Sequence, residues 1–233
     1  MCLNLVLAFQ GGVSAADWLD RCMAYHDPDH LWTDFAYALE LRESRPDGTI
    51  RNVAVTLDKP GDRFVYEADI NGERVFRSKI GDQVQVRFND SAEIDPDTAK
   101  KYRLSENDVG FYKNYYLFLY GIPAKLKDPG AHMQKTAEKA TFMGQSAMAL
   151  TITYDPEVGQ DTWTFYLNPE SAALIGCRFT RVPGSTKPDE YIVFEGIYEL
   201  GSMRLPKKRT WYITGEDRLL GSDELVGHRQ VRP

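Results

Sequence analysis

The segment FYKNYYLFLYGIPAKLKDPG, residues Phe111 to Gly130, gives the strongest indication of the fold. All but two of the residues in Phe111–Tyr120 are aromatic or aliphatic. A helical period places these side chains on adjoining faces, so the helix needs cover on nearly all sides. Gly121 ends the helix, and Pro123 prevents an early restart. We therefore predict a short helix over Phe111–Tyr120 that lies in a concavity formed by the flanking segments.

Alternation with a period of two, typical of half-buried strands, occurs on both sides of this helix. It starts near Trp32 and continues to Phe88, with Asn71-Gly72 as the strongest hairpin signal. It resumes at Met148 and continues to about Thr214, which gives about eleven strands in all. The segment from Gly221 onward is polar and is expected to fray.

Two further helices are predicted. Ala15–His26 carries one apolar stripe, Ser14 can cap it, and Asp27 with Pro28 ends it. A short helix follows Asp95 and ends near Tyr102.

The predicted strands are apolar on one face and rich in Thr, Arg and Gln on the other, which indicates a sheet with one solvated face. A sheet this long must curl or split. We predict a mainly β (α+β) fold, with a single curved antiparallel sheet that forms an unclosed barrel and helices against its concave face. The whole of residues 16–233 is predicted to be one domain.

Composition excludes several classes of partner. The formal net charge is −6, and the basic clusters are small, so nucleic acid is not expected as a partner. No apolar run approaches the roughly 18 residues of a membrane span. Of the three cysteines, Cys22 and Cys177 fall on apolar faces. They are interpreted as buried thiols, with a disulfide between them as the alternative.

The N-terminus has features of an export signal. Leu3–Phe9 is apolar, and Val13-Ser14-Ala15 has the small residues that a signal peptidase needs. A basic segment before the apolar run is missing. We predict a signal peptide over residues 1–15 and a periplasmic or otherwise exported mature chain that begins near Ala16; the alternative is an apolar N-terminus that packs on the body.

Four strings resemble an uncharacterised family of exported bacterial proteins whose fold is similar to that of LolA-like carriers and sensors. They are YHDPDHLW (25–32), YKNYYLFLYGIPAKLKDPG (112–130), YDPEVGQDTWTFYLNP (154–169) and LPKKRTWY (205–212). The resemblance implies a LolA-like unclosed barrel with helices at its mouth, and ligands that are acyl chains or lipoproteins. The motifs carry no known chemistry, so the resemblance gives no catalytic residue.

No residues with the spacing of a metal site or of a catalytic site were found. Pro28 interrupts the pair His26 and His30, and the acidic 155–161 loop misses the spacing of a calcium loop. Gly144–Met148 lacks the final glycine of a nucleophile elbow and precedes a strand. We predict no metal, no cofactor and no catalytic residue.

The preferred hypothesis is a non-enzymatic envelope protein that binds an apolar or lipid-like ligand in the half-barrel. Tyrosines on the helix suit a partly hydrated cavity, because each buried hydroxyl needs a partner. Two alternatives remain: an interaction or scaffold module with a filled core, which meets another envelope protein, and a hydrolase with an unrecognised site. The predicted ligand-binding residues are Tyr112, Tyr115, Tyr116, Phe118, Tyr120, Lys125, Lys127, Trp163, Phe165 and Trp211.

Overall fold

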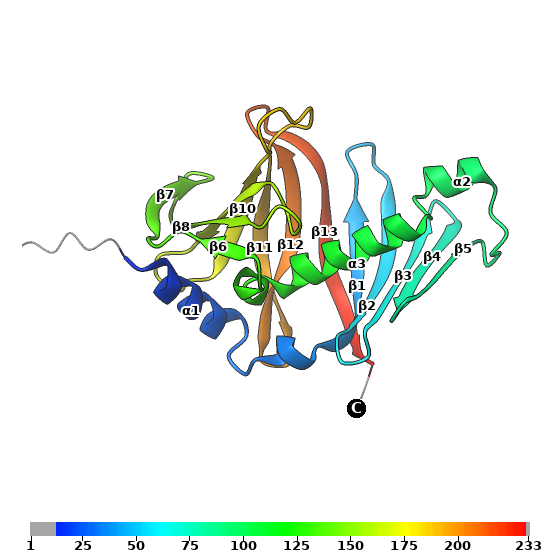
Figure 1. Ribbon diagram of the computed structural model, residues 1–233, viewed down its shortest axis with the longest axis horizontal. Helices are drawn as coiled ribbons and strands as arrows, with labels where there is room; N and C mark the ends of the chain where they lie inside the picture. The colour runs from blue at the N-terminus through cyan, green and yellow to red at the C-terminus, as the bar shows by residue number, and fades with distance from the viewer. Residues whose placement is uncertain (1–12, 232–233) are drawn as a thin grey trace, which may run out of the picture.

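The computed structural model describes residues 13–231 and contains one antiparallel sheet of 13 strands. The strand order is β5-β4-β3-β2-β1-β13-β12-β11-β10-β9-β8-β6, and β7 pairs with β8 off this path. The end strands β5 and β6 do not pair with each other, so the sheet stays open, and helix α3 crosses one of its faces (Figure 1). The prediction of a single curved, unclosed antiparallel sheet is confirmed.

The first half of the chain is the predicted meander. Its strands are β1 (Ala36–Ser44), β2 (Ile50–Asp58), β3 (Arg63–Ile70), β4 (Glu73–Ile80) and β5 (Gln83–Phe88). Asn71 and Gly72 form the two-residue loop between β3 and β4, and both have positive φ, as the tightest hairpin turns require. The alternation of side chains therefore predicted this half of the sheet.

The second half has more strands than expected. They are β6 (Ala131–Met133), β7 (Glu138–Phe142), β8 (Gln145–Tyr154), β9 (Thr162–Leu167), β10 (Leu174–Thr180), β11 (Glu190–Leu200), β12 (Met203–Ile213) and β13 (Arg218–Gln230). The expectation that the chain frays from Gly221 is wrong. β13 lies between β1 and β12 and pairs with both, so it joins the two halves of the sheet. Its polar residues mostly face outward, whereas Leu225 is fully buried.

Helix α1 spans Ala15–His26, as predicted. The Ser14 hydroxyl accepts a hydrogen bond from the Asp17 amide at 3.3 Å. At the other end, the Asp27 carboxylate accepts the amides of Leu31 and Trp32, at 2.7 and 3.0 Å. These bonds start the 3-10 helix η1 (Leu31–Asp34) where a strand was expected, so β1 begins later than predicted.

His26 connects α1 to the sheet. Its Nδ1 donates to the Arg204 carbonyl, and its Nε2 accepts the Leu174 amide at 2.9 Å. Burial lowers the pKa of His26 to about 4, so the ring is neutral at physiological pH. Both ring nitrogens have protein partners, which agrees with a structural role for this residue.

Helix α2 (Pro96–Lys101) leads into α3 (Glu106–Gly121), which begins earlier than predicted. A capping box between Ser105 and Asp108 fixes its start. Its end at Gly121 was predicted, and the structure adds a reason. A Cβ at Gly121 would overlap the Trp32 indole, so only glycine lets the helix end pack against η1. The 3-10 helix η2 (Ala124–Lys127) follows.

The apolar Leu3–Phe9 run lies outside the described residues. Val13 and Ala15 bond to the segment before β7: the Ala137 amide donates to the Val13 carbonyl at 2.8 Å, and the Ala15 amide donates to the Lys135 carbonyl at 3.1 Å. A mature chain that starts near Ala16 stays a prediction. Within residues 13–231, none of the helices combines the length and hydrophobicity needed to cross a membrane.

Cys22 and Cys177 are buried free thiols, so the alternative of a disulfide between them is not realised. Burial raises the pKa of both thiols, which keeps them protonated and unreactive. Across residues 13–231, no three His, Cys, Asp or Glu side chains gather as a metal site would require.

Candidate ligand pocket beneath helix α3

A row of four charged side chains crosses the sheet beneath α3. Strand register pairs Arg51 of β2 with Glu43 of β1, Glu43 with Asp223 of β13, and Asp223 with Arg209 of β12. Glu43, Asp223 and Arg209 are 7 %, 5 % and 1 % exposed. They occupy inward positions of strands whose other inward residues are apolar, so these charges lie in the core.

Two tyrosines of α3 bond to the two carboxylates of this row. The Tyr116 hydroxyl donates to Glu43 Oε1 at 3.1 Å, and the Tyr120 hydroxyl donates to Asp223 Oδ2 at 3.2 Å. Their ring centroids are 6.3 Å apart and the rings are stacked. One turn of helix rises about 5.4 Å, close to the spacing of neighbouring strands, so residues four apart on α3 reach adjacent strands.

Arg209 is buried without a full set of partners. Its guanidinium lies 4.1 Å from the centroid of the Tyr120 ring, and its Nη1 donates to the Pro206 carbonyl at 3.1 Å. Its Nε has no hydrogen-bond partner among residues 13–231, and neither does Asp223 Oδ1. Arg209 and Asp223 form no ion pair in the described chain, although they are opposite in register. Buried polar atoms are rarely left unpaired, which marks this place as unusual.

The acid–base properties of the row follow from its burial. Desolvation raises the pKa of Asp223 to about 7; the nearby Arg209 opposes this shift, and the Glu43 carboxylate adds to it. Asp223 therefore changes charge near neutral pH. Burial also raises the pKa of Tyr116 and Tyr120 well above the usual value, so both hydroxyls stay protonated as donors.

A cavity of about 260 Å³ opens beside Asp223, between α3 and strands β12 and β13. Its lining combines aromatic and charged side chains: Glu43, Arg45, Tyr115, Tyr116, Glu190, Trp211, Leu220, Ser222 and Asp223. Three of the predicted ligand-binding residues, Tyr115, Tyr116 and Trp211, are among them, and Tyr120 lies directly behind through its bond to Asp223.

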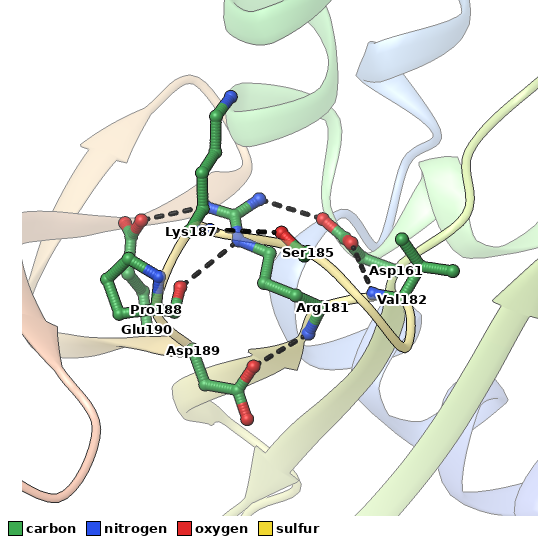
Figure 2. A network of polar contacts seen from close by, with 8 residues as sticks. All are labelled: Asp161, Arg181, Val182, Ser185, Lys187, Pro188, Asp189 and Glu190. Atoms are coloured by element: carbon green, nitrogen blue, oxygen red, sulfur yellow. Dashed lines mark hydrogen bonds and ion pairs between the residues drawn. The ribbon is translucent and has the colours of Figure 1, made fainter.

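Glu190 is held at this cavity by a network shown in Figure 2. Arg181 donates from Nη2 to Glu190 Oε1 at 2.7 Å and from Nη1 to Asp161 Oδ2 at 2.8 Å. The Asp189 carboxylate accepts the Arg181 amide at 2.8 Å. The network joins the loop after β8 to the loop after β10, so Glu190 is fixed in place and its charge is compensated.

Phe118, Trp163 and Phe165 lie elsewhere, in a packed aromatic cluster. The Phe118 and Trp163 centroids are 5.0 Å apart, and Trp163 stacks on Phe179 at 4.5 Å. Phe165 is fully buried. The structure does not bring these three residues to the cavity; they fill the core under the C-terminal part of α3.

Tyr112 lies toward the other end of α3, where cations stack on rings. The Arg77 guanidinium is 4.2 Å from the Tyr112 centroid and 4.5 Å from the Tyr66 centroid. Arg77 donates to the carbonyls of Tyr102 and Arg103, and its Nη1 has no partner among the described residues. Tyr112 is thus part of a second buried polar cluster under the same helix.

The two predicted lysines are engaged in ion pairs. Lys125 pairs with Asp128 and lines a separate cavity of about 280 Å³ between η2 and the β2–β3 turn. Lys127 pairs with Asp20 of α1 at 2.5 Å and lines none of the cavities described here. Neither lysine reaches the cavity beside Asp223.

The outer face of the sheet carries a larger groove of about 690 Å³ over strands β1 to β5. Outward-pointing residues along it include Glu40, Glu67, Phe76 and Arg87. Acidic and basic side chains are mixed along it and most are exposed, so it has no single chemical character.

The sequence interpretation missed Glu43, Glu190, Arg209 and Asp223. A signal existed for two of them. Glu43 continues the inward alternation of Leu39 and Leu41, and Arg209 comes two residues before Trp211 on the same face. A charged residue at an apolar position of a strand points to a buried polar site.

A family model described as a family of unknown function (DUF6503) matches residues 1–228. No curated protein matches the chain. A LolA superfamily protein from Nitrosomonas europaea has a similar structure, with 10% identity, a TM-score of 0.51, and coverage of 95% of this chain and 94% of that one. A DUF1329 family protein from Desulfovibrio piger has 8% identity, a TM-score of 0.52 and 94% coverage of both chains. At such identities the likeness concerns the fold alone.

Proposed function

The chain belongs to the DUF6503 family of unknown function and has a LolA-like fold, and we propose that it is a non-enzymatic carrier or sensor of the cell envelope. It binds an apolar or amphipathic, lipid-like ligand on the concave face of the half-barrel. It acts outside the cytoplasm, as the resemblance to exported LolA-like proteins implies.

The observation that carries this proposal is the buried polar row beside an aromatic cavity. A filled core would not be expected to leave both Arg209 Nε and Asp223 Oδ1 unpaired, because an unsatisfied buried polar group costs about 1–3 kcal/mol. Ligand sites combine apolar walls with a few placed polar groups, and the cavity under α3 has aromatic side chains beside charged ones.

Helix α3 acts as the plug of the half-barrel. It covers the concave face with Val109, Tyr116 and Leu119, and it exposes Phe111, which is 52 % exposed. The cavity of about 260 Å³ is slightly smaller than a typical ligand site, which holds about 300–1,000 Å³. Uptake of a whole acyl chain therefore requires α3 to shift away from the sheet.

The main alternative is an interaction module with a filled core. The burial of Tyr116 and Tyr120, at 2 % and 0 % exposed, favours it, because these side chains occupy the space that a ligand would take. The two proposals differ in one property: a carrier opens beneath α3 in the presence of ligand, and a filled module does not.

A titration with a dansyl-labelled acyl chain tests the proposal. Wild type is compared with Tyr115→Ala and Trp211→Ala, which alter half-buried residues of the cavity wall, and with Phe111→Ala, an exposed aromatic on the same helix, as the control. We expect blue-shifted dansyl emission with wild type and the control, and weaker binding for the two wall variants. Absence of binding by wild type would reject the carrier and leave the interaction module.

Thermal unfolding of the same variants completes the test. Tyr115→Ala and Trp211→Ala should lower the melting temperature only slightly. A loss of stability of about 3–5 kcal/mol in both, as for aromatic truncations in a packed core, would instead support the filled module.

A further inference from the structure

The lining of the cavity beside Asp223 has more carboxylates than cations. It contains the carboxylates of Glu43, Glu190 and Asp223 and one guanidinium, that of Arg45. The lining thus presents carboxylate oxygens and one cation to a bound headgroup, so an anionic headgroup is disfavoured.

Two of these carboxylates are already neutralised. Glu43 Oε2 lies 3.1 Å from Arg45 Nη2 and 3.9 Å from Arg51 Nη1. Glu190 lies 2.7 Å from Arg181. Asp223 alone has no ion pair with residues 13–231, and it is 5 % exposed. It is the one carboxylate of this cavity whose charge a ligand could balance.

Asp223 also has an unused acceptor. Tyr120 donates to Oδ2, whereas Oδ1 has no partner in the described chain. A carboxylate oxygen accepts hydrogen bonds, so the missing partner is a donor. A buried, unpaired carboxylate oxygen in a cavity wall therefore indicates the chemistry of the group that would fill the space.

The remaining wall suits a cation as well. Tyr115, Tyr116 and Trp211 line the cavity, and aromatic faces attract cations. Resting on the proposed function, we propose that this cavity takes the protonated amino group of an amphipathic ligand, a primary or secondary ammonium that donates N–H bonds to Asp223.

The charged and titratable groups around Asp223 are Arg209 from β12, Glu43 from β1, and Tyr115, Tyr116 and Tyr120 from α3. Arg45, just after β1, and Glu190 of β11 line the same cavity, and each is in an ion pair with another residue. Arg209 is held over the Tyr120 ring and forms no ion pair with Asp223, so it does not replace the ligand. The pKa of Asp223 is about 7 without ligand, and an ammonium neighbour favours the ionised form. Amine binding should therefore strengthen as the pH rises through about 7.

Displacement of the dansyl-labelled acyl chain by four molecules with the same alkyl chain tests this inference. They are dodecylamine, dodecyltrimethylammonium, dodecanol and dodecanoate, each below its micellar concentration. At about pH 8, dodecylamine should bind wild type about tenfold more tightly than dodecanol or dodecanoate. Dodecyltrimethylammonium should be weaker than dodecylamine, because it has no N–H group to donate.

Asp223→Asn should abolish the preference for the amine, while Glu67→Gln, which removes an exposed carboxylate on the opposite face, should keep it. Wild type at about pH 5 should lose the preference as well, which repeats the test without a substitution. If the labelled chain binds and dodecylamine is no better than dodecanol, the inference fails and the carrier proposal stands. Equal binding of both ammonium compounds would reject the hydrogen bond to Asp223. If neither the labelled chain nor dodecylamine binds, by fluorescence and by calorimetry, both proposals fail.

Discussion

Glu43 and Asp223 are directly opposite each other on the paired strands β1 and β13, and each carboxylate accepts a hydrogen bond from a tyrosine hydroxyl of α3. Tyr116 and Tyr120 provide these hydroxyls one helical turn apart. The plug helix is therefore joined to the sheet by two bonds to acidic groups as well as by apolar packing. We therefore expect the attachment of α3 to the concave face to depend on the protonation of these two carboxylates.

Loss of one of these bonds should loosen the plug. Tyr120→Phe leaves both Asp223 oxygens without a donor, and we expect a loss of about 2 kcal/mol in the free energy of unfolding at about pH 8. Tyr115→Phe is the control, since the Tyr115 hydroxyl makes no hydrogen bond to another residue in the part of the chain described. Urea unfolding measures both. Equal effects of the two variants would contradict the role of the Tyr120 hydroxyl.

Asp223 should make stability fall as the pH rises. Its pKa is about 7 in the folded state and 3.8 as an unperturbed group, so as the pH rises the unfolded chain loses this proton at a lower pH than the folded chain does. The contribution to stability is complete below about pH 4 and is lost as the pH rises through about 7, by about 4 kcal/mol in all. Subtraction of the pH profile of Asp223→Asn from that of wild type isolates this effect. A flat difference between about pH 4 and 8 would show that Asp223 is not desolvated.

His26 should have the opposite dependence. Its pKa is about 4 in the folded state and 6.5 as an unperturbed group, so as the pH falls the unfolded chain takes up this proton at a higher pH than the folded chain does. Stability from His26 is complete above about pH 6.5 and falls by about 3 kcal/mol as the pH drops toward 4. The difference between wild type and His26→Gln should shrink over this range. His30→Gln, at the exposed 3-10 helix cap, is the control and should follow wild type.

Substitution of the two glycines of α3 by alanine should have opposite effects on the stability of the fold. At Gly121 a Cβ would overlap the Trp32 indole, so Gly121→Ala should destabilise the fold by about 1–3 kcal/mol. At Gly110 a Cβ meets nothing within 4 Å, so Gly110→Ala should stabilise it by up to about 1 kcal/mol. Thermal unfolding distinguishes them. Stabilisation by both substitutions would mean that α3 does not end against Trp32.

The sequence predicted the elements whose signals are local. Ser14 at its start and Pro28 beyond its end bounded α1, and alternation with an Asn-Gly turn gave the first five strands. β13 was missed because bulges opposite Leu41 and at Trp211/Tyr212 break its register, and because most of its outward residues are polar.

The pocket was less predictable than the fold. Tyr115, Tyr116 and Trp211 were identified from their residue types, but Glu43 and Asp223 meet only through the pairing of β1 with β13. These strands are far apart in the sequence, so only strand register brings the two acids together. A single sequence does not fix that register, so the carboxylates of the cavity were not predicted.

Native mass spectrometry of the protein isolated from its host under mild conditions shows directly whether a lipid-like ligand is bound. We expect a fraction of wild-type molecules to carry a non-covalent adduct of lipid-like mass, and we expect Trp211→Ala but not Phe111→Ala to lose this adduct. Wild type that is free of adduct, and that gains none from added lipid extract, would reject the proposed carrier. An adduct that persists equally in both variants would place the ligand elsewhere on the molecule.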